Sequence, residues 1–217
     1  MNPLPILRDS WFFFSRHLGA IALLCLPPLA LESLSRQALR AVDGTQPSAG
    51  YEVLLGLLFY PLYTGSLILF LDSRSRGETP GTARLWAGAL GLWPRLALLT
   101  AITSLLIMLG MSLLVLPAIF VMVKLAFSEY LLVLRGMPPL PALRDSYRLT
   151  QGHFLQILAL VLSTMLPLWL LGAWSSGWLG DDPAFLPSVL LDCAIGFVQL
   201  FASVAMFRLF MLIEEKS

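Results

Sequence analysis

The sequence has few charged residues for its length. Asp, Glu, Lys and Arg make up 12% of the 217 residues, whereas hydrophobic residues make up 58% and the mean hydropathy is +0.81. A typical soluble domain carries about 25% charged residues, so this composition could not cover a water-facing surface. The shortage of charge predicts a protein embedded in a bilayer. The formal net charge of +1 gives no indication of nucleic-acid binding.

Cysteines and catalytic motifs are also scarce. The two cysteines, Cys25 and Cys193, lie in apolar runs without metal-ligand spacing, so neither a disulfide framework nor a zinc site is predicted. No Gly-x-Ser-x-Gly, His-Glu-x-x-His, Walker A or Gly-x-Gly-x-x-Gly string occurs. His17 and His153 would make a conceivable metal pair, but no carboxylate or cysteine cluster joins them, which favours interfacial positioning. We expect a protein that is not an enzyme and needs no cofactor.

Long apolar runs predict the membrane-crossing helices, since a span needs ~20 mostly apolar residues. The run from Leu96 to Leu134 would form a helix of ~58 Å at 1.5 Å per residue, against a hydrocarbon core of ~30 Å. It must fold back, and Pro117 marks the expected break because proline lacks an amide hydrogen. We predict an all-α integral membrane protein with six spans, or five if the hairpin at Pro117 only re-enters the membrane. The six are expected at about His17–Ala38, Val53–Leu71, the two halves of Leu96–Leu134, Phe154–Ser175 and Leu186–Phe207.

The distribution of basic residues predicts the orientation, because short cytoplasmic loops are rich in Lys and Arg. With the N-terminus inside, the cytoplasmic segments hold eleven basic residues and the outer loops hold only Arg36 and Arg40. Both termini are therefore expected in the cytoplasm, which requires an even number of spans. The eleven are Arg8, Arg16, Arg74, Arg76, Arg84, Arg95, Arg135, Arg144, Arg148, Arg208 and Lys216.

A polar string occurs twice, as "PLPILRDSWFFFSRH" from Pro3 and "PLPALRDSYRLTQGH" from Pro139, and nine of nineteen positions agree between Pro3–Ile21 and Pro139–Ile157. Apolar residues at helical spacing predict an amphipathic interfacial helix before each span. A weaker third version, "PGTARLWAGALGLWPRL", precedes the third span. The chain therefore divides into three hairpin-like repeats of one membrane domain, about 1–72, 73–135 and 136–217. The predicted apolar face holds Leu4, Leu7, Trp11, Phe14 and Leu18 in the first copy, and Leu140, Leu143, Tyr147, Thr150 and Phe154 in the second.

Arginines on these helices are the candidate lipid contacts. Arg8, Arg84, Arg144 and Arg148 would lie beside the inner leaflet, where each basic residue attracts anionic headgroups by about 1 kcal/mol. A purely architectural repeat is compatible with this role. Anionic membrane lipids are the expected partner, whereas a protein partner or a homo-oligomer is left open.

The charged residues Lys124, Glu129 and Asp192 fall inside predicted spans. Lys124 and Asp192 lie at similar expected depths, ~9 Å and ~7.5 Å from the outer face at 1.5 Å per residue, so they are predicted to pair if their helices are neighbours. Glu129 is the rival partner of Lys124. Intramembrane charges also mark transport pathways, which is the alternative interpretation.

The stretch "LPAIFVMVKLAFSEYLLVLRGMPPLPALRDSYRLTQGHF" resembles the YciC family of bacterial inner-membrane proteins, as do "RDSWFFFSRHLGAIALL" and "FRLFMLI". A more distant resemblance is to the membrane domain attached to some glycerophosphodiester phosphodiesterases, whose catalytic domain is absent here. The resemblance implies a six-span inner-membrane protein of a Gram-negative bacterium, without an established activity. The shared pattern is Pro117 followed by Ala142, Leu143, Arg144, Ser146, Arg148, Leu149 and Thr150.

These observations favour a non-enzymatic, multi-pass inner-membrane protein that supports envelope or lipid homeostasis. The alternative is a small transporter or a lipid-translocating protein, which would need a polar pathway. A membrane enzyme that acts on lipid is a third and weaker hypothesis, because no catalytic group is recognisable.

Overall fold

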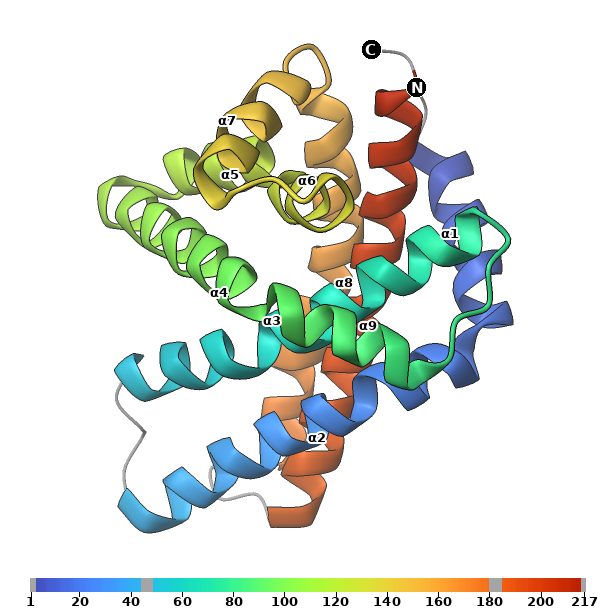
Figure 1. Ribbon diagram of the computed structural model, residues 1–217. Helices are drawn as coiled ribbons and strands as arrows, with labels where there is room; N and C mark the ends of the chain where they lie inside the picture. The colour runs from blue at the N-terminus through green and yellow to red at the C-terminus, as the bar shows by residue number, and fades with distance from the viewer. Residues whose placement is uncertain (1–2, 44–48, 180–184, 216–217) are drawn as a thin grey trace.

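The computed structural model describes residues 3–43, 49–179 and 185–215, and every regular element in these ranges is a helix (Figure 1). This confirms the predicted all-α class. The helices are α1 (Pro3–Arg16), α2 (Leu18–Asp43), α3 (Ala49–Ser75), α4 (Thr82–Leu113), α5 (Val115–Leu125), α6 (Ser128–Arg135), α7 (Pro139–Leu149), α8 (Phe154–Leu179) and α9 (Phe185–Glu214).

The helix α9 is at the centre of the arrangement and packs against α1, α2, α3 and α8. α8 and α9 run side by side, and α2, α3 and α4 cross them as successive neighbours (Figure 1). The short helices α5, α6 and α7 gather at the far end of α4. The second half of α1, the C-terminal part of α9 and the end of α3 with the turn after it surround one cavity, which is the site described below.

Aromatic side chains join α6 to α9 in the core. Phe127 and Phe210 are fully buried with ring centroids 5.6 Å apart, and Tyr130 stacks on Phe210 at the same separation. The hydroxyl of Tyr130 donates to the carbonyl oxygen of Ser203 at 2.9 Å. A buried tyrosine needs such a partner, so this contact fixes the two helices in register as well as in position.

The number of membrane spans agrees with the prediction only in part. In the described residues, five segments are long and apolar enough to cross a membrane, and a sixth follows if α7 and the first part of α8 form one bent span. The surface of α4 is strongly apolar, since Leu98, Leu105 and Leu109 are each more than half exposed. Large contiguous apolar surfaces are rare on soluble monomers, so these side chains face lipid or another apolar surface.

The predicted fold-back of the long apolar run is present. The chain turns at Leu114, whose extended backbone (φ −171°, ψ 159°) separates α4 from α5, so the break lies three residues before Pro117. A second break, at Ala126 and Phe127, was not expected. The run is therefore one long helix followed by two short ones.

The third predicted interfacial helix does not exist as a separate element, and this prediction is corrected. Its residues belong to α4, which continues through Pro94 without interruption. α7 ends just before Gly152, which has a positive φ of 81°, whereas no such residue divides α4. In addition, the indole N–H of Trp93 donates to the carbonyl oxygen of Leu58 at 2.9 Å and holds this part of α4 on α3.

The two copies of the repeated string do form separate helices, α1 and α7, and their buried face agrees with the predicted one in part. Phe14, Leu143 and Thr150 are buried as predicted, whereas Leu4 and Leu140 are 74% and 68% exposed. Three buried positions are equivalent in the two copies, 136 residues apart, and include small and polar side chains. They are Ile6, Ser10 and Phe14 in the first copy, and Ala142, Ser146 and Thr150 in the second.

Replacing Gly110 by alanine is expected to destabilise the hairpin between α4 and α5. A methyl group there would lie 2.8 Å from the Cα of Ala118, which is backbone and cannot move aside. Overpacking of this kind costs ~1–3 kcal/mol, and small residues allow such close helix contacts in membranes. Thermal unfolding of the detergent-solubilised protein measures the loss. The matched control is Gly91→Ala in the same helix, where a methyl group meets nothing within 4 Å, so stability should be unchanged or slightly higher. Equal effects of the two substitutions would contradict this account of the hairpin.

Candidate functional site

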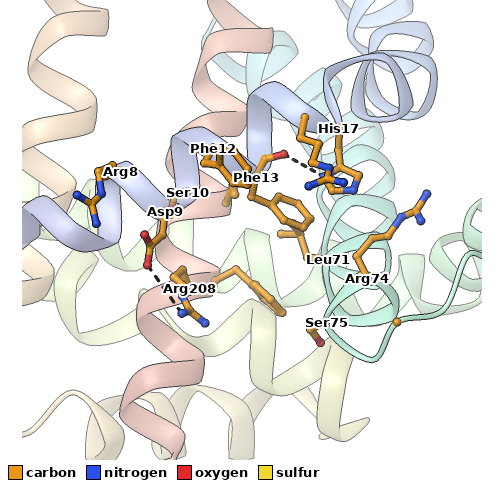
Figure 2. Close-up of a pocket in the computed structure, with 14 residues that line it drawn as sticks. Arg8, Asp9, Ser10, Phe12, Phe13, His17, Leu71, Arg74, Ser75 and Arg208 are labelled. Carbon is orange, nitrogen blue, oxygen red and sulfur yellow. Dashed lines mark hydrogen bonds and ion pairs between the residues drawn. The ribbon is translucent and has the colours of Figure 1, made fainter.

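A cavity of about 750 Å³ lies where α1 and the ends of α3 and α9 meet (Figure 2). This volume is within the range of ~300–1,000 Å³ that is usual for small-molecule pockets. The side chains of Arg8 and Asp9 come from α1, Arg74 and Ser75 from the end of α3, and Arg208 from α9.

Positive charge dominates the lining. Of the described residues that line the cavity, four are arginines and only Asp9 is acidic, so the formal charge is 4 − 1 = +3 with His17 neutral. Asp9 neutralises little of this charge, because its carboxylate lies 3.9 Å from Arg208 and both side chains are about half exposed. The cavity is therefore strongly attractive to an anion. The arginines are Arg8, Arg16, Arg74 and Arg208.

Apolar side chains form the rest of the wall and fix the polar ones. Phe13 stacks on the His17 ring at 4.4 Å, and the Nδ1–H of His17 donates to the carbonyl oxygen of Phe13 at 3.0 Å (Figure 2). The guanidinium of Arg74 lies 5.3 Å from the centroid of the Phe70 ring. Leu71 and Phe207 complete a wall on which an aliphatic chain can rest.

Two polar atoms in this lining have no hydrogen-bond partner within the described part of the chain. They are the Oγ of Ser10, a residue only 2% exposed, and the Nε of Arg74. Buried polar groups in folded proteins are nearly always satisfied. Both residues contribute to the lining of the cavity, but these two atoms are themselves buried and do not face it.

The second copy of the string borders a smaller and less basic cavity. It has a volume of about 380 Å³, and Asp145 and His153 line it in positions equivalent to Asp9 and His17. Only Arg135 and Arg148 contribute positive charge among its described lining residues, and Arg135 is already paired with Glu214. The cavity at α1 is thus the larger and more basic of the pair.

The four arginines that were predicted to contact lipid lie in different places in the structure. Arg8 lines the large cavity and Arg148 the smaller one, whereas Arg84 and Arg144 are exposed outside both. Sequence reasoning used Arg16, Arg74 and Arg208 only to predict orientation and overlooked Ser10. The rule that places basic residues inside could have grouped the arginines at one membrane face, but it does not say which of them converge.

Lys124 and Asp192, predicted to pair, have different partners in the structure. The ammonium of Lys124 lies 4.7 Å from the centroid of the Tyr147 ring and 5.7 Å from that of Phe120. Asp192 accepts a hydrogen bond from the hydroxyl of Ser33 at 3.2 Å. The reason is helix adjacency: α5 packs against α4, α7 and α8, whereas Asp192 is on α9 beside α2.

The rival partner of Lys124 is also engaged elsewhere. Glu129 in α6 accepts a hydrogen bond from the hydroxyl of Tyr60 in α3 at 3.2 Å. Near Asp192, Glu32 and Arg36 form an ion pair within α2. The acidic groups inside the apolar segments are thus held by local partners.

The sequence profile of an uncharacterised protein family, UPF0259, matches residues 49–212. This range covers about three quarters of the chain. The chain belongs to the UPF0259 family. Since YciC is a member of this family, the YciC resemblance is confirmed, whereas the link to glycerophosphodiester phosphodiesterases is unsupported. No solved structure matches the chain.

The UPF0259 match begins at α3, so only some of the residues that line the large cavity fall inside the matched range. Arg74 and Arg208 lie inside the matched range, whereas Arg8, Ser10 and Arg16 precede it. The contribution of α1 to the site is therefore argued from this chain's own residues.

Lys124 and Tyr147 are expected to couple energetically, and Lys124 and Asp192 are not. A cation–π contact is worth ~0.5–2 kcal/mol, depending on burial, so Lys124→Met and Tyr147→Leu should lose less together than the sum of their separate losses. Lys124→Met combined with Asp192→Asn should be additive within ~0.5 kcal/mol. Thermal unfolding in detergent measures both double-mutant cycles. Coupling in the second cycle without coupling in the first would restore the Lys124–Asp192 pair.

Proposed function

We propose that this UPF0259 protein is a non-enzymatic, multi-pass protein of a bacterial inner membrane that binds anionic lipid headgroups at the cytoplasmic face and thereby supports envelope or lipid homeostasis. The observation that carries the proposal is the cavity at α1, where four arginines and a buried serine surround an apolar wall. Arginine forms bidentate hydrogen bonds with phosphate oxygens, and the apolar wall suits the start of an acyl chain.

The arrangement of α1 and α7 supports contact with the lipid headgroup layer. α7 meets the first part of α8 at 105°, so the two cannot both lie along the membrane normal. Arg144 and Arg148 are exposed on α7, and basic residues beside an anionic leaflet contribute about 1 kcal/mol each. The proposed surface therefore consists of the cavity and the exposed arginines around it.

The transporter alternative is less well supported. A transport pathway would need polar groups that a substrate can engage, yet Glu129 is bound by Tyr60, Asp192 by Ser33 and Lys124 by two aromatic rings. Local partners of this kind are typical of polar residues that hold membrane helices together.

Both termini are expected in the cytoplasm. Reporter fusions after Ser217 and within Gly77–Thr82, the turn beside the cavity, should both give a cytoplasmic signal, because the basic residues of short loops lie inside. A periplasmic signal from the turn would place the arginine cavity on the outer face and would exclude binding to the inner leaflet.

Binding of an anionic lipid should depend on the arginines of the cavity more than on other exposed arginines. The double variant Arg16→Gln/Arg208→Gln removes two cavity charges, and Arg84→Gln/Arg144→Gln removes two exposed charges outside it. In detergent, we expect short-chain phosphatidylglycerol to bind the first variant at least tenfold more weakly than the wild type, whereas the second changes affinity by less than about fivefold. Equal losses would indicate general attraction to a basic surface and would contradict a defined site.

A further inference from the structure

We infer that a small cavity around the carboxylate of Glu129 binds an organic ammonium ion. This cavity, called the glutamate cavity below, has a volume of about 170 Å³ and lies among α3, α6, α8 and α9. The inference goes beyond the proposed function and does not depend on it, because the glutamate cavity shares no described lining residue with the arginine cavity at α1. Its support is an open carboxylate oxygen, a missing counter-ion and an aromatic wall.

The carboxylate of Glu129 is only partly occupied. The residue belongs to the apolar segment Val115–Arg135, which is long enough to span a membrane. Its Oε2 accepts the hydrogen bond from Tyr60, whereas its Oε1 has no hydrogen-bond partner among the described residues and is not buried. An ionised carboxylate has about four acceptor positions, so the Tyr60 contact leaves most of them unused. A ligand in the cavity that Glu129 lines can therefore donate to this carboxylate.

No cation accompanies the charge of Glu129. The carboxylate forms no ion pair within the described part of the chain, and its hydrogen-bond donor, the hydroxyl of Tyr60, is neutral. A charged side chain inside a membrane segment is costly, and such residues commonly mark functional sites. A cationic ligand supplies the missing counter-charge. It needs no pathway across the membrane, so the site is distinct from a transport route.

A neighbouring cavity of the same volume shows what Glu129 lacks. Asp192 lines that cavity and accepts a hydrogen bond from the hydroxyl of Ser33 at 3.2 Å, so it too has a neutral donor. Arg36, however, lines the same cavity. A cation is thus present in that lining, whereas none occurs in the described lining of the glutamate cavity. The two cavities have three lining residues in common, Tyr63, Gly196 and Gln199.

Tyrosine rings form the wall next to the carboxylate. Tyr60 and Tyr63 both line the glutamate cavity, with ring centroids 5.4 Å apart and ring planes at 76°. Two rings at nearly a right angle can form adjacent walls of one pocket, and the hydroxyl of Tyr60 joins them to Glu129 at 3.2 Å. Aromatic faces attract ammonium groups that lie within about 6 Å of the ring centroid. The combination of carboxylate and rings is suited to an ammonium ion.

The volume and the available side chains limit the type of cation. At ~30 Å³ for each water molecule, the cavity has room for about five non-hydrogen atoms. A divalent metal ion needs several oxygen ligands, and the described residues hold no group of three His, Cys, Asp or Glu side chains that could bind one. A primary alkylammonium ion fits, because its N–H groups donate to Oε1 of Glu129. Its methylene groups contact apolar lining residues such as Met165 and Leu200.

Ligand-detected NMR titration of the purified protein tests the inference, in a non-ionic detergent and an amine-free buffer, with protein-free micelles as the blank. The ligand is butylammonium, which is charged near pH 7 as a lysine side chain is. Butanol, its neutral analogue, and sodium are tested as competitors. We expect butylammonium to bind with millimolar affinity, in keeping with its few atoms. Butanol and sodium should compete at least tenfold less effectively.

The variant Glu129→Gln should lower the affinity for butylammonium at least tenfold, because it removes a charge-assisted hydrogen bond and keeps an acceptor for Tyr60. The matched control is Asp192→Asn, which removes a similarly bonded carboxylate from the neighbouring cavity. It should change the affinity by less than about threefold, since only a longer-range charge is lost. Thermal unfolding of each variant without ligand verifies that it is folded.

The variant Tyr63→Leu tests the aromatic wall independently, because it leaves the carboxylate in place. It should lower the affinity for butylammonium about three- to tenfold, which is the loss expected for one cation–π contact. Unchanged affinity in this variant would exclude the ring from the site.

The contrary outcomes are distinct. Butanol competing as well as butylammonium would overturn the recognition of a cation, and sodium doing so would overturn the organic class of ligand. Undiminished affinity in Glu129→Gln, or an equal loss in Asp192→Asn, would overturn Glu129 as the binding group. The absence of butylammonium binding would overturn the site itself and leave the proposed lipid function standing, because the arginine cavity has its own lining.

Discussion

A helix that breaks inside a membrane exposes backbone N–H and C=O groups that lipid cannot satisfy. At the break between α5 and α6, the hydroxyl of Ser146 bridges the N–H of Phe127 and the carbonyl of Lys124, and the hydroxyl of Ser128 donates to the carbonyl of Leu125. This requirement places α7 against the break, and α7 in turn covers the ammonium of Lys124 with the ring of Tyr147. The position of α7 thus follows from a hydrogen-bonding need in the apolar core.

In the first copy, the equivalent hydroxyl of Ser10 has no hydrogen-bond partner among the described residues. α1 keeps the same buried register and packs on α9 through aromatic contacts, with Phe14 5.5 Å from Phe197 and Trp11 5.7 Å from Phe201 between ring centroids. Its serine lines a cavity instead of a backbone break. One sequence pattern therefore bonds to the backbone of a neighbouring segment in the second copy and packs against α9 in the first. Only the surroundings of the two helices make this difference, not the helices themselves.

Much of the fold could be predicted from the sequence, and the predictions that were wrong have physical causes. Composition and run length predicted a helical membrane protein and a fold-back near Pro117, since both depend on local properties. The buried face of α1 and α7 was misjudged because the periodicity of apolar residues does not distinguish core from lipid, and Leu4 and Leu140 face outward. Small and polar positions such as Ser10 and Ser146 are the better indicator of helix contact in a membrane.

Contacts between residues that are distant in the sequence set a second limit to prediction. Expected depth in the membrane placed Lys124 and Asp192 at one level, but depth says nothing of which helices are neighbours. The same limit hid the cavity, whose lining residues Arg16, Arg74 and Arg208 come from three helices. These helices are far apart in the sequence, and only their packing in the folded chain brings the three arginines to the wall of one cavity.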